Sequence, residues 1–299
     1  MARLARIGGL LVAGGLALAA QPVPALAPKV DRGTFLAEQE AWRQDRLARL
    51  TKPEGWLSVV GLEWLAQGEN VVGSGDGVRL HLPAKAPARV GVFTWRDGKV
   101  SFKAEPGVVP MQAGKPFTEG ELQPDASPMI AIGDLRMTII QRGPKMGLRV
   151  RDTKAEAFSE FKGIPAFRPD PAWRLEARFE AYPEPREMMV PSVIGIPTQE
   201  KVPGKAIFTV KGRTYSLEPV IEDDHLFFIF RDATAGHETY GAVRFLYTAM
   251  PKDGKVVLDF NRAENPPCAF TAYATCPLPP KGNILALAIR AGEKDPHLH

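Results

Sequence analysis

Residues 90–103 read VGVFTWRDGKVSFK and contain two short apolar runs on either side of Asp97-Gly98. Asp-Gly favours the positive φ angles of a two-residue hairpin turn. The flanking runs, Val90–Trp95 and Lys99–Lys103, are rich in β-branched and aromatic residues, which suit a pleated strand. The stretch therefore predicts an antiparallel β-hairpin.

The same alternation of apolar runs with Gly, Pro and Asp continues along the chain from Gly55, with a spacing of about 8 to 12 residues. Two more turn signals, Lys211-Gly212 and Asp253-Gly254, separate such runs. This spacing is typical of β-sandwiches and barrels. We predict an all-β fold, mainly sandwich or barrel, with a single N-terminal helix.

The helix is predicted over residues 31–52, where Asp31 can cap the start and Lys52-Pro53 ends the pattern. Residues 153–170 are first polar and then interrupted by Gly and Pro, which predicts a boundary there. A β-sandwich-like half is expected over 55–152. A second β-rich half, with a C-terminal Cys-containing block, is expected over 164–294. One continuous β-protein is the alternative.

The N-terminus carries Arg3 and Arg6, followed by the apolar run Ile7–Ala20 and then small residues. This pattern predicts a signal peptide over residues 1–20 with cleavage near residues 19–27, and hence a periplasmic or extracellular protein. The apolar run is short for a membrane span, so no stable span is expected after cleavage. An uncleaved anchor is the alternative.

The chain has 299 residues and a formal net charge of +4, and its Lys and Arg residues are scattered. Scattered charge gives no nucleic-acid footprint. The run Arg149-Val150-Arg151-Asp152 is mixed in sign and is interpreted as a solvated face. The sequence leaves the oligomeric state open.

Cys268 and Cys276 are the only cysteines of the chain. In an exported protein a disulfide is the default for such a pair. Two buried free thiols, or a metal-binding or catalytic thiol, are the alternatives. None of the five histidines has a metal-like spacing from the cysteines, so no metal and no cofactor are predicted.

Polar side chains lie at the ends of predicted strands in the second half, where they would converge if those strands pair. Asp232 or Asp259 could then act as a general base, and Arg244 could place an anionic or carbonyl group. A structural ion-pair network is the alternative. The predicted ligand-binding residues are Arg231, Asp232, Thr234, Tyr240, Arg244, Asn261, Asn265 and Tyr273.

Several blocks of sequence together resemble one family over about residues 35–294. These blocks are Gly55–Leu65, Gly68-Glu69-Asn70, Gly147–Asp152, Phe230–Thr234, Glu238–Gly241, Arg244-Phe245-Leu246 and the Cys268/Cys276 block. The family is DUF1684, a group of uncharacterised proteins, and the resemblance implies no particular activity. Separately, the order of strands and turns in the first half weakly resembles the forkhead-associated class, which would bear on fold alone.

Three functions remain open at the level of sequence. The first is an exported protein that binds a small polar molecule or glycan near the C-terminal Cys block. The second is a hydrolase-like enzyme that uses Asp232 or Asp259 with Arg244, and the third is a structural envelope protein.

Overall fold

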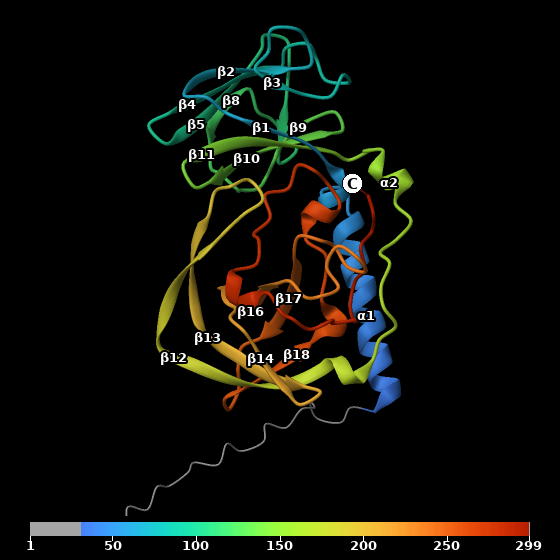
Figure 1. The fold of residues 1–299 in the computed structure, drawn as a ribbon. Coiled ribbons are helices and arrows are strands. Elements are labelled where there is room, and N and C mark those ends of the chain that lie inside the picture. The colour runs from blue at the N-terminus through green and yellow to red at the C-terminus, as the bar shows by residue number, and fades with distance from the viewer. Residues whose placement is uncertain (1–30, 299) are drawn as a thin grey trace, which may run out of the picture.

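The computed structural model describes residues 31–298 and consists of two β-rich units beside one long helix (Figure 1). The all-β fold with an N-terminal helix is thereby confirmed. Helix α1 (Arg32–Thr51) begins after Asp31, whose carboxylate accepts a hydrogen bond from the Thr34 N–H at 3.0 Å. The predicted signal peptide, residues 1–20, lies outside the described residues.

The first unit is a sandwich of two sheets, drawn in cyan and green at the top of Figure 1. One sheet has the strand order β1-β11-β10-β9-β6-β7, and the other has the order β3-β2-β4-β5-β8. The strands are β1 (Val59–Trp64), β2 (Gly68–Gly73), β3 (Leu80–His81), β4 (Gly91–Arg96), β5 (Lys99–Ala104), β6 (Met111–Gln112), β7 (Lys115–Pro116), β8 (Glu119–Leu122), β9 (Ile130–Ile132), β10 (Leu135–Arg142) and β11 (Lys145–Asp152).

The sandwich holds together because alternate residues of its strands point inward. Phe93 on β4 and Phe102 on β5 are buried with ring centroids 4.9 Å apart. From the other sheet, Met137, Leu148 and Val150 pack into the same core. The sequence of β11 therefore divides into an apolar face toward this core and a second face that carries Arg149 and Arg151.

The second unit is built from two further sheets, with the orders β14-β13-β12-β18 and β15-β16-β17. A short helix, α2 (Ala157–Glu160), lies in the connection between the units. The strands are β12 (Arg174–Val190), β13 (Thr198–Val210), β14 (Arg213–Leu217), β15 (Val220–Glu222), β16 (His225–Phe230), β17 (Arg244–Ala249) and β18 (Lys255–Asp259).

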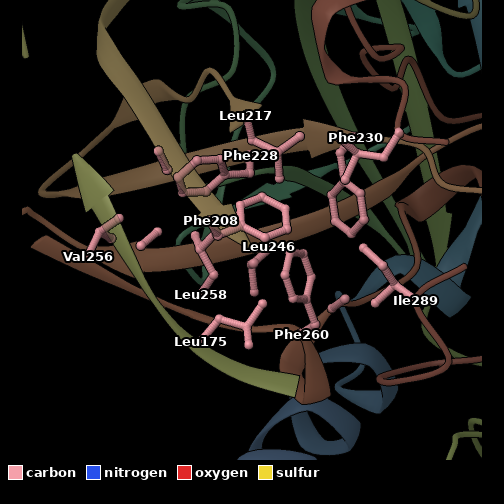
Figure 2. Packing of buried hydrophobic residues seen from close by; sticks show 14 of the residues in the cluster. Leu175, Phe208, Leu217, Phe228, Phe230, Leu246, Val256, Leu258, Phe260 and Ile289 are labelled. Carbon is pink, nitrogen blue, oxygen red and sulfur yellow. The ribbon is translucent and has the colours of Figure 1, made fainter. Parts of the chain in front are cut away.

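Aromatic rings fill the space between these two sheets (Figure 2). Phe208 from β13 and Phe230 from β16 each lie against Phe260, with centroids 5.6 and 5.7 Å apart. Phe228 and Leu246 are fully buried in the same cluster. All five residues from Leu226 to Phe230 are buried, so β16 has one face in this core and its opposite face covered by something else.

The predicted turns form as the dipeptides indicated. Asp97 and Gly98 have φ angles of 50° and 76°, and the flanking residues Arg96 and Lys99 pair. Lys211-Gly212 and Asp253-Gly254 likewise combine two positive φ angles. Each dipeptide thus supplies the turn geometry that joins two twisted antiparallel strands.

The two units are joined by a long hairpin and by the C-terminal residues. The β12–β13 hairpin has a register shift between Ala181 and Arg186, and beyond it the hairpin runs toward the sandwich (yellow in Figure 1). We call residues 259–280 the Cys segment. Within it, Thr271 donates a hydrogen bond to the Val59 carbonyl of the sandwich at 3.0 Å, which ties the units together.

Candidate functional site

A cavity of about 770 Å³ lies between the two units. Its wall is formed by the outer face of β16 and β17, the tip of the β12–β13 hairpin, the end of α1, the β10–β11 turn and the Cys segment. The lining residues include Arg46, Arg49, Glu54, Trp56, Arg142, Arg151, Ser192, Ile194, Ile196, Glu200, Glu222, Phe227, Ile229, Phe245, Tyr247, Glu264, Thr275, Cys276 and Pro277. Pockets of this size suit a small molecule.

The apolar wall follows from the alternation of β16. Phe228 points into the aromatic core, so Phe227 and Ile229 point to the opposite face and line the cavity. Phe245 on β17 lies beside Phe227, with centroids 4.8 Å apart and an edge-to-face angle of 83°. The second face of β16 therefore borders the cavity.

The tip of the β12–β13 hairpin, a turn between the two strands, forms another wall of the cavity. Ser192, Ile194 and Ile196 are half-buried and line the cavity, whereas Val193 between them is 42% exposed. The Cys segment holds this tip in place, because the Val193 N–H donates to the Cys276 carbonyl at 3.0 Å. The cavity wall and the Cys segment are thus one connected structure.

A group of guanidinium groups lies where the sandwich meets the Cys segment. Arg142 Nε and Arg149 Nη2 both donate to the Thr275 hydroxyl, at 2.9 and 3.4 Å. Arg149 is only 5% exposed, and its guanidinium lies 5.0 Å from the centre of the Trp56 ring. Burial, together with the nearby charges of Arg142 and Arg151, lowers the pKa of Arg149 to about 10. The interpretation of Arg149–Asp152 as a solvated face is therefore wrong, because the second unit covers that face.

Carboxylates line another side of the cavity, and most already have partners. Glu264 lies 3.4 Å from Arg46 and 3.6 Å from Arg49. Burial raises the pKa of Glu264, and Arg46 opposes that rise. Glu222 accepts a hydrogen bond from the Tyr247 hydroxyl at 3.5 Å, and burial raises its pKa too. Buried acids with raised pKa values carry less negative charge at a given pH.

The residues predicted as catalytic lie elsewhere. Asp232 and Arg244 form an ion pair of 2.7 Å in which neither side chain is more than 1% exposed. Asp232 also accepts hydrogen bonds from the Thr234 hydroxyl and backbone, and Arg244 donates to the carbonyls of Ile289 and Ala291. These contacts are those of a structural network, and neither residue lines the cavity.

The remaining predicted residues are dispersed around the C-terminal part of the chain. Asp259 accepts a hydrogen bond from Gln39 of α1 at 2.7 Å, and Asn261 bonds the backbone of Asp170. Asn265 donates to the Lys294 carbonyl, and Tyr240 donates to the Cys268 carbonyl. Arg231 is exposed, as is Tyr273 at 41%. The structure brings Asp232, Thr234 and Arg244 together. Asp259 and Asn261 form a separate pair, in which the Asn261 amide donates to the Asp259 carboxylate at 2.9 Å.

Cys268 and Cys276 are free thiols that lie side by side, so the predicted disulfide is not formed in this structure. The Cys268 N–H donates to the Cys276 sulfur at 3.2 Å. A hydrogen bond from the Cys276 thiol lowers the pKa of Cys268, although burial opposes this shift. The same contact raises the pKa of Cys276. The pair is asymmetric, with Cys268 the more acidic and the more exposed.

We expect iodoacetamide to modify Cys268 of the reduced protein well before Cys276, because the thiolate is the reactive species. Replacing Cys276 by alanine removes the hydrogen-bond donor, so the pH midpoint of Cys268 alkylation should move upward. Peptide mass spectrometry across a pH series measures both effects. Equal labelling of the two cysteines, or a downward shift in the variant, would contradict this asymmetry.

Within residues 31–298, no three His, Cys, Asp or Glu side chains are grouped so as to hold a metal ion. Over the same range, the structure contains no helix with the length and apolar character of a membrane span. Sequence reasoning missed the guanidinium groups of the cavity. The available signal was Arg149-Val150-Arg151, since alternation places both arginines on one strand face.

Comparison with known proteins gives a family but no activity. Residues 159–294 match DUF1684, described as a protein of unknown function. A solution NMR structure of an uncharacterized protein from Haloarcula marismortui is 30% identical, with 47% of this chain and 80% of that chain covered and a TM-score of 0.40. No curated protein matches the chain.

A solved structure from a study of phosphothreonine-dependent FHA domain interactions is also similar in part. It is 17% identical, with 30% of this chain and 92% of that chain covered and a TM-score of 0.20. A similarity this weak carries no argument about fold or function. Through residues 159–294, with the Cys segment included, this chain belongs to the DUF1684 family.

Proposed function

We propose that this protein is exported and binds a small polar molecule or glycan in the cavity beside the Cys segment. The observation that supports binding most is the cavity of about 770 Å³, with Thr275, Cys276 and Pro277 in its wall. Both polar and apolar side chains face this space, as in sites that orient a ligand by a few polar contacts. Export rests on Arg3, Arg6 and the apolar run Ile7–Ala20.

A thermal-shift screen of metabolites and glycans tests this function in combination with a cavity-filling variant. A ligand at about 100 times its Kd should raise the Tm by on the order of 5 °C. Ile194→Trp should abolish that rise, because Ile194 faces the cavity. The matched control is Val193→Trp, which should retain the rise because Val193 is 42% exposed and points away. If the screen finds no ligand whose rise in Tm is lost in Ile194→Trp, the proposal is wrong.

A structural role is favoured by one separate observation, the burial of the Cys segment. Asn265 is 1% exposed, and Thr271 ties the segment to the sandwich at 3.0 Å. The same cavity experiment separates the two functions, since a purely structural protein has no ligand-induced shift to lose.

In the exported protein we further propose a Cys268–Cys276 disulfide. Mass spectrometry without reductant would then show a mass lower by two hydrogens and no alkylation.

A further inference from the structure

We propose that the ligand of this cavity is a small amphipathic anion, with its oxyanion head at Arg151 and Arg142 and its apolar body against Phe227 and Ile229. This inference rests on the proposed ligand binding in the cavity, and it replaces a wholly polar ligand by one that has a charged head and an apolar body. Three features of the described residues lead to it: arginines that lack carboxylate partners, acids that are already paired, and an apolar wall.

The first feature is a pair of arginines without acid partners. Buried Nε atoms of Arg149 and Arg151 have no hydrogen-bond partner among the described residues. Arg174, Arg244 and Arg262 also have such an Nε, but each of them forms an ion pair with a carboxylate. For Arg149 and Arg151, by contrast, the structure contains no ion pair over residues 31–298. Buried charges are normally paired, so two guanidinium groups without a carboxylate partner favour an anion as their partner.

The arginines come from β10 and β11, at the sandwich end of the cavity. Arg142 and Arg151 line the cavity. Arg149 lies between them, because it shares the Thr275 hydroxyl with Arg142 and the Trp56 ring, at 5.0 Å, with Arg151 at 6.0 Å. Only Asp125 pairs with this group in the described structure, at 3.1 Å from Arg142. Like charges close together repel, so this end of the cavity favours an anion. Guanidinium groups also match the geometry of carboxylate and phosphate oxygens.

The acids that line the cavity offset only part of this charge. Burial lowers the pKa of Arg151, and the charge of Glu54 opposes that shift, so Glu54 favours the charged form of Arg151. Glu264 is shared between Arg46 and Arg49, and Glu54 lies 3.7 Å from Arg136. Glu222 is on β15 of the second unit and accepts a hydrogen bond from Tyr247. Glu200, on the hairpin, is half-buried. Three of these four acids therefore have partners in the structure, whereas Arg151 has no carboxylate partner among residues 31–298.

The apolar wall suits the rest of such a ligand. Phe227 and Phe245 form an edge-to-face pair, and Ile229, Ile194 and Ile196 also line the same space. A hydrocarbon body against these side chains would remove apolar surface from water, which favours binding. The two kinds of wall together predict recognition of a charged head and an apolar body in one molecule.

Isothermal titration calorimetry of the reduced, mature protein with decanoate, decyl phosphate, decanol and decylamine tests the charge assignment. Both anions should bind at least about tenfold more tightly than decanol and decylamine, because charge-assisted hydrogen bonds contribute to the anions alone. The ratio between decanoate and decyl phosphate distinguishes a carboxylate head from a phosphate head. Binding of decanol or decylamine as tight as that of both anions, or no binding of either anion, would overturn the inference.

Two variants test whether the anion binds at Arg151. Arg151→Gln should weaken binding of the preferred anion about tenfold or more, and its thermal stability should not fall, since the lost charge has no acid partner in residues 31–298. Arg213→Gln is the matched control, because Arg213 is exposed on β14, and its affinity should be unchanged. Unchanged affinity in Arg151→Gln would contradict the assignment.

The Ile194→Trp variant distinguishes a failure of the anion inference from a failure of the proposed binding function. If decylamine or decanol binds and Ile194→Trp abolishes that binding, the cavity is a ligand site but the anion inference is wrong. If none of the four probes binds and the screen also finds no ligand sensitive to Ile194→Trp, both the anion inference and the binding function fail.

Discussion

Replacing Asp232 by alanine is expected to lower the free energy of unfolding by about 3–5 kcal/mol. The substitution leaves the Arg244 guanidinium without its carboxylate in a place where its side chain is 1% exposed. It also removes the acceptor for the Thr234 hydroxyl and backbone N–H. Urea denaturation followed by circular dichroism measures the change.

The matched control for Asp232→Ala is Glu238→Ala, in a pair that water reaches. Glu238 lies 2.8 Å from Arg290, whose side chain is 63% exposed. Exposed pairs contribute about 0–1 kcal/mol, so this variant should remain near wild type. Similar losses in the two variants would show that the Asp232–Arg244 pair is not the structural centre that its burial indicates.

The fold was predictable because its signals are local. The dipeptides Asp97-Gly98, Lys211-Gly212 and Asp253-Gly254 each carry the turn geometry within two residues, and all three form it. The helix was equally visible from Asp31 and the Pro after Lys52. Its buried stripe was harder to predict, since Gln39 and Arg46 are buried there beside Phe35 and Leu50. Their partners, Asp259 and Glu293, are more than 200 residues away in sequence.

The site was less predictable because it depends on which faces of the two units pack against each other. Sequence placed Asp232 and Arg244 at strand ends, and it left open a pocket or an ion-paired network. Strand pairing of Phe230 with Arg244 puts the two charges in contact inside the protein. By contrast, Arg149 and Arg151 have the alternation of a solvent face. Only the docking of the second unit, through contacts such as Arg142 to Thr275, turns that face inward.

Replacing Arg46 by methionine is expected to cost about 3–5 kcal/mol at neutral pH. Arg46 is 6% exposed and holds three groups of the C-terminal part: Glu293 at 2.9 Å, Glu264 at 3.4 Å and the Asn265 carbonyl at 2.9 Å. Methionine preserves much of the apolar volume but leaves two buried carboxylates near each other. Urea denaturation at about pH 8 measures the loss.

The same variant should recover part of its stability in acid. Burial already raises the pKa of Glu264 above its ordinary value of 4.5, Glu293 adds to this rise, and Arg46 opposes it. Without Arg46 the pKa of Glu264 in the folded state rises further. A folded-state pKa above the unfolded value favours folding below about pH 4.5, and that contribution is lost as the pH rises through the folded value. The deficit of Arg46→Met relative to wild type should therefore be smaller at about pH 5 than at about pH 8.

The control for the effect of burial is Arg49→Met, one turn further along α1. Arg49 lies 3.6 Å from the same Glu264 carboxylate, but its side chain is 48% exposed. Solvent screens that contact, so the expected loss is about 0–1 kcal/mol, with little change between the two pH values. Equal losses for Arg46→Met at both pH values would show that its effect arises from lost packing, for example against the Phe270 ring at 5.5 Å, and not from the unpaired carboxylates.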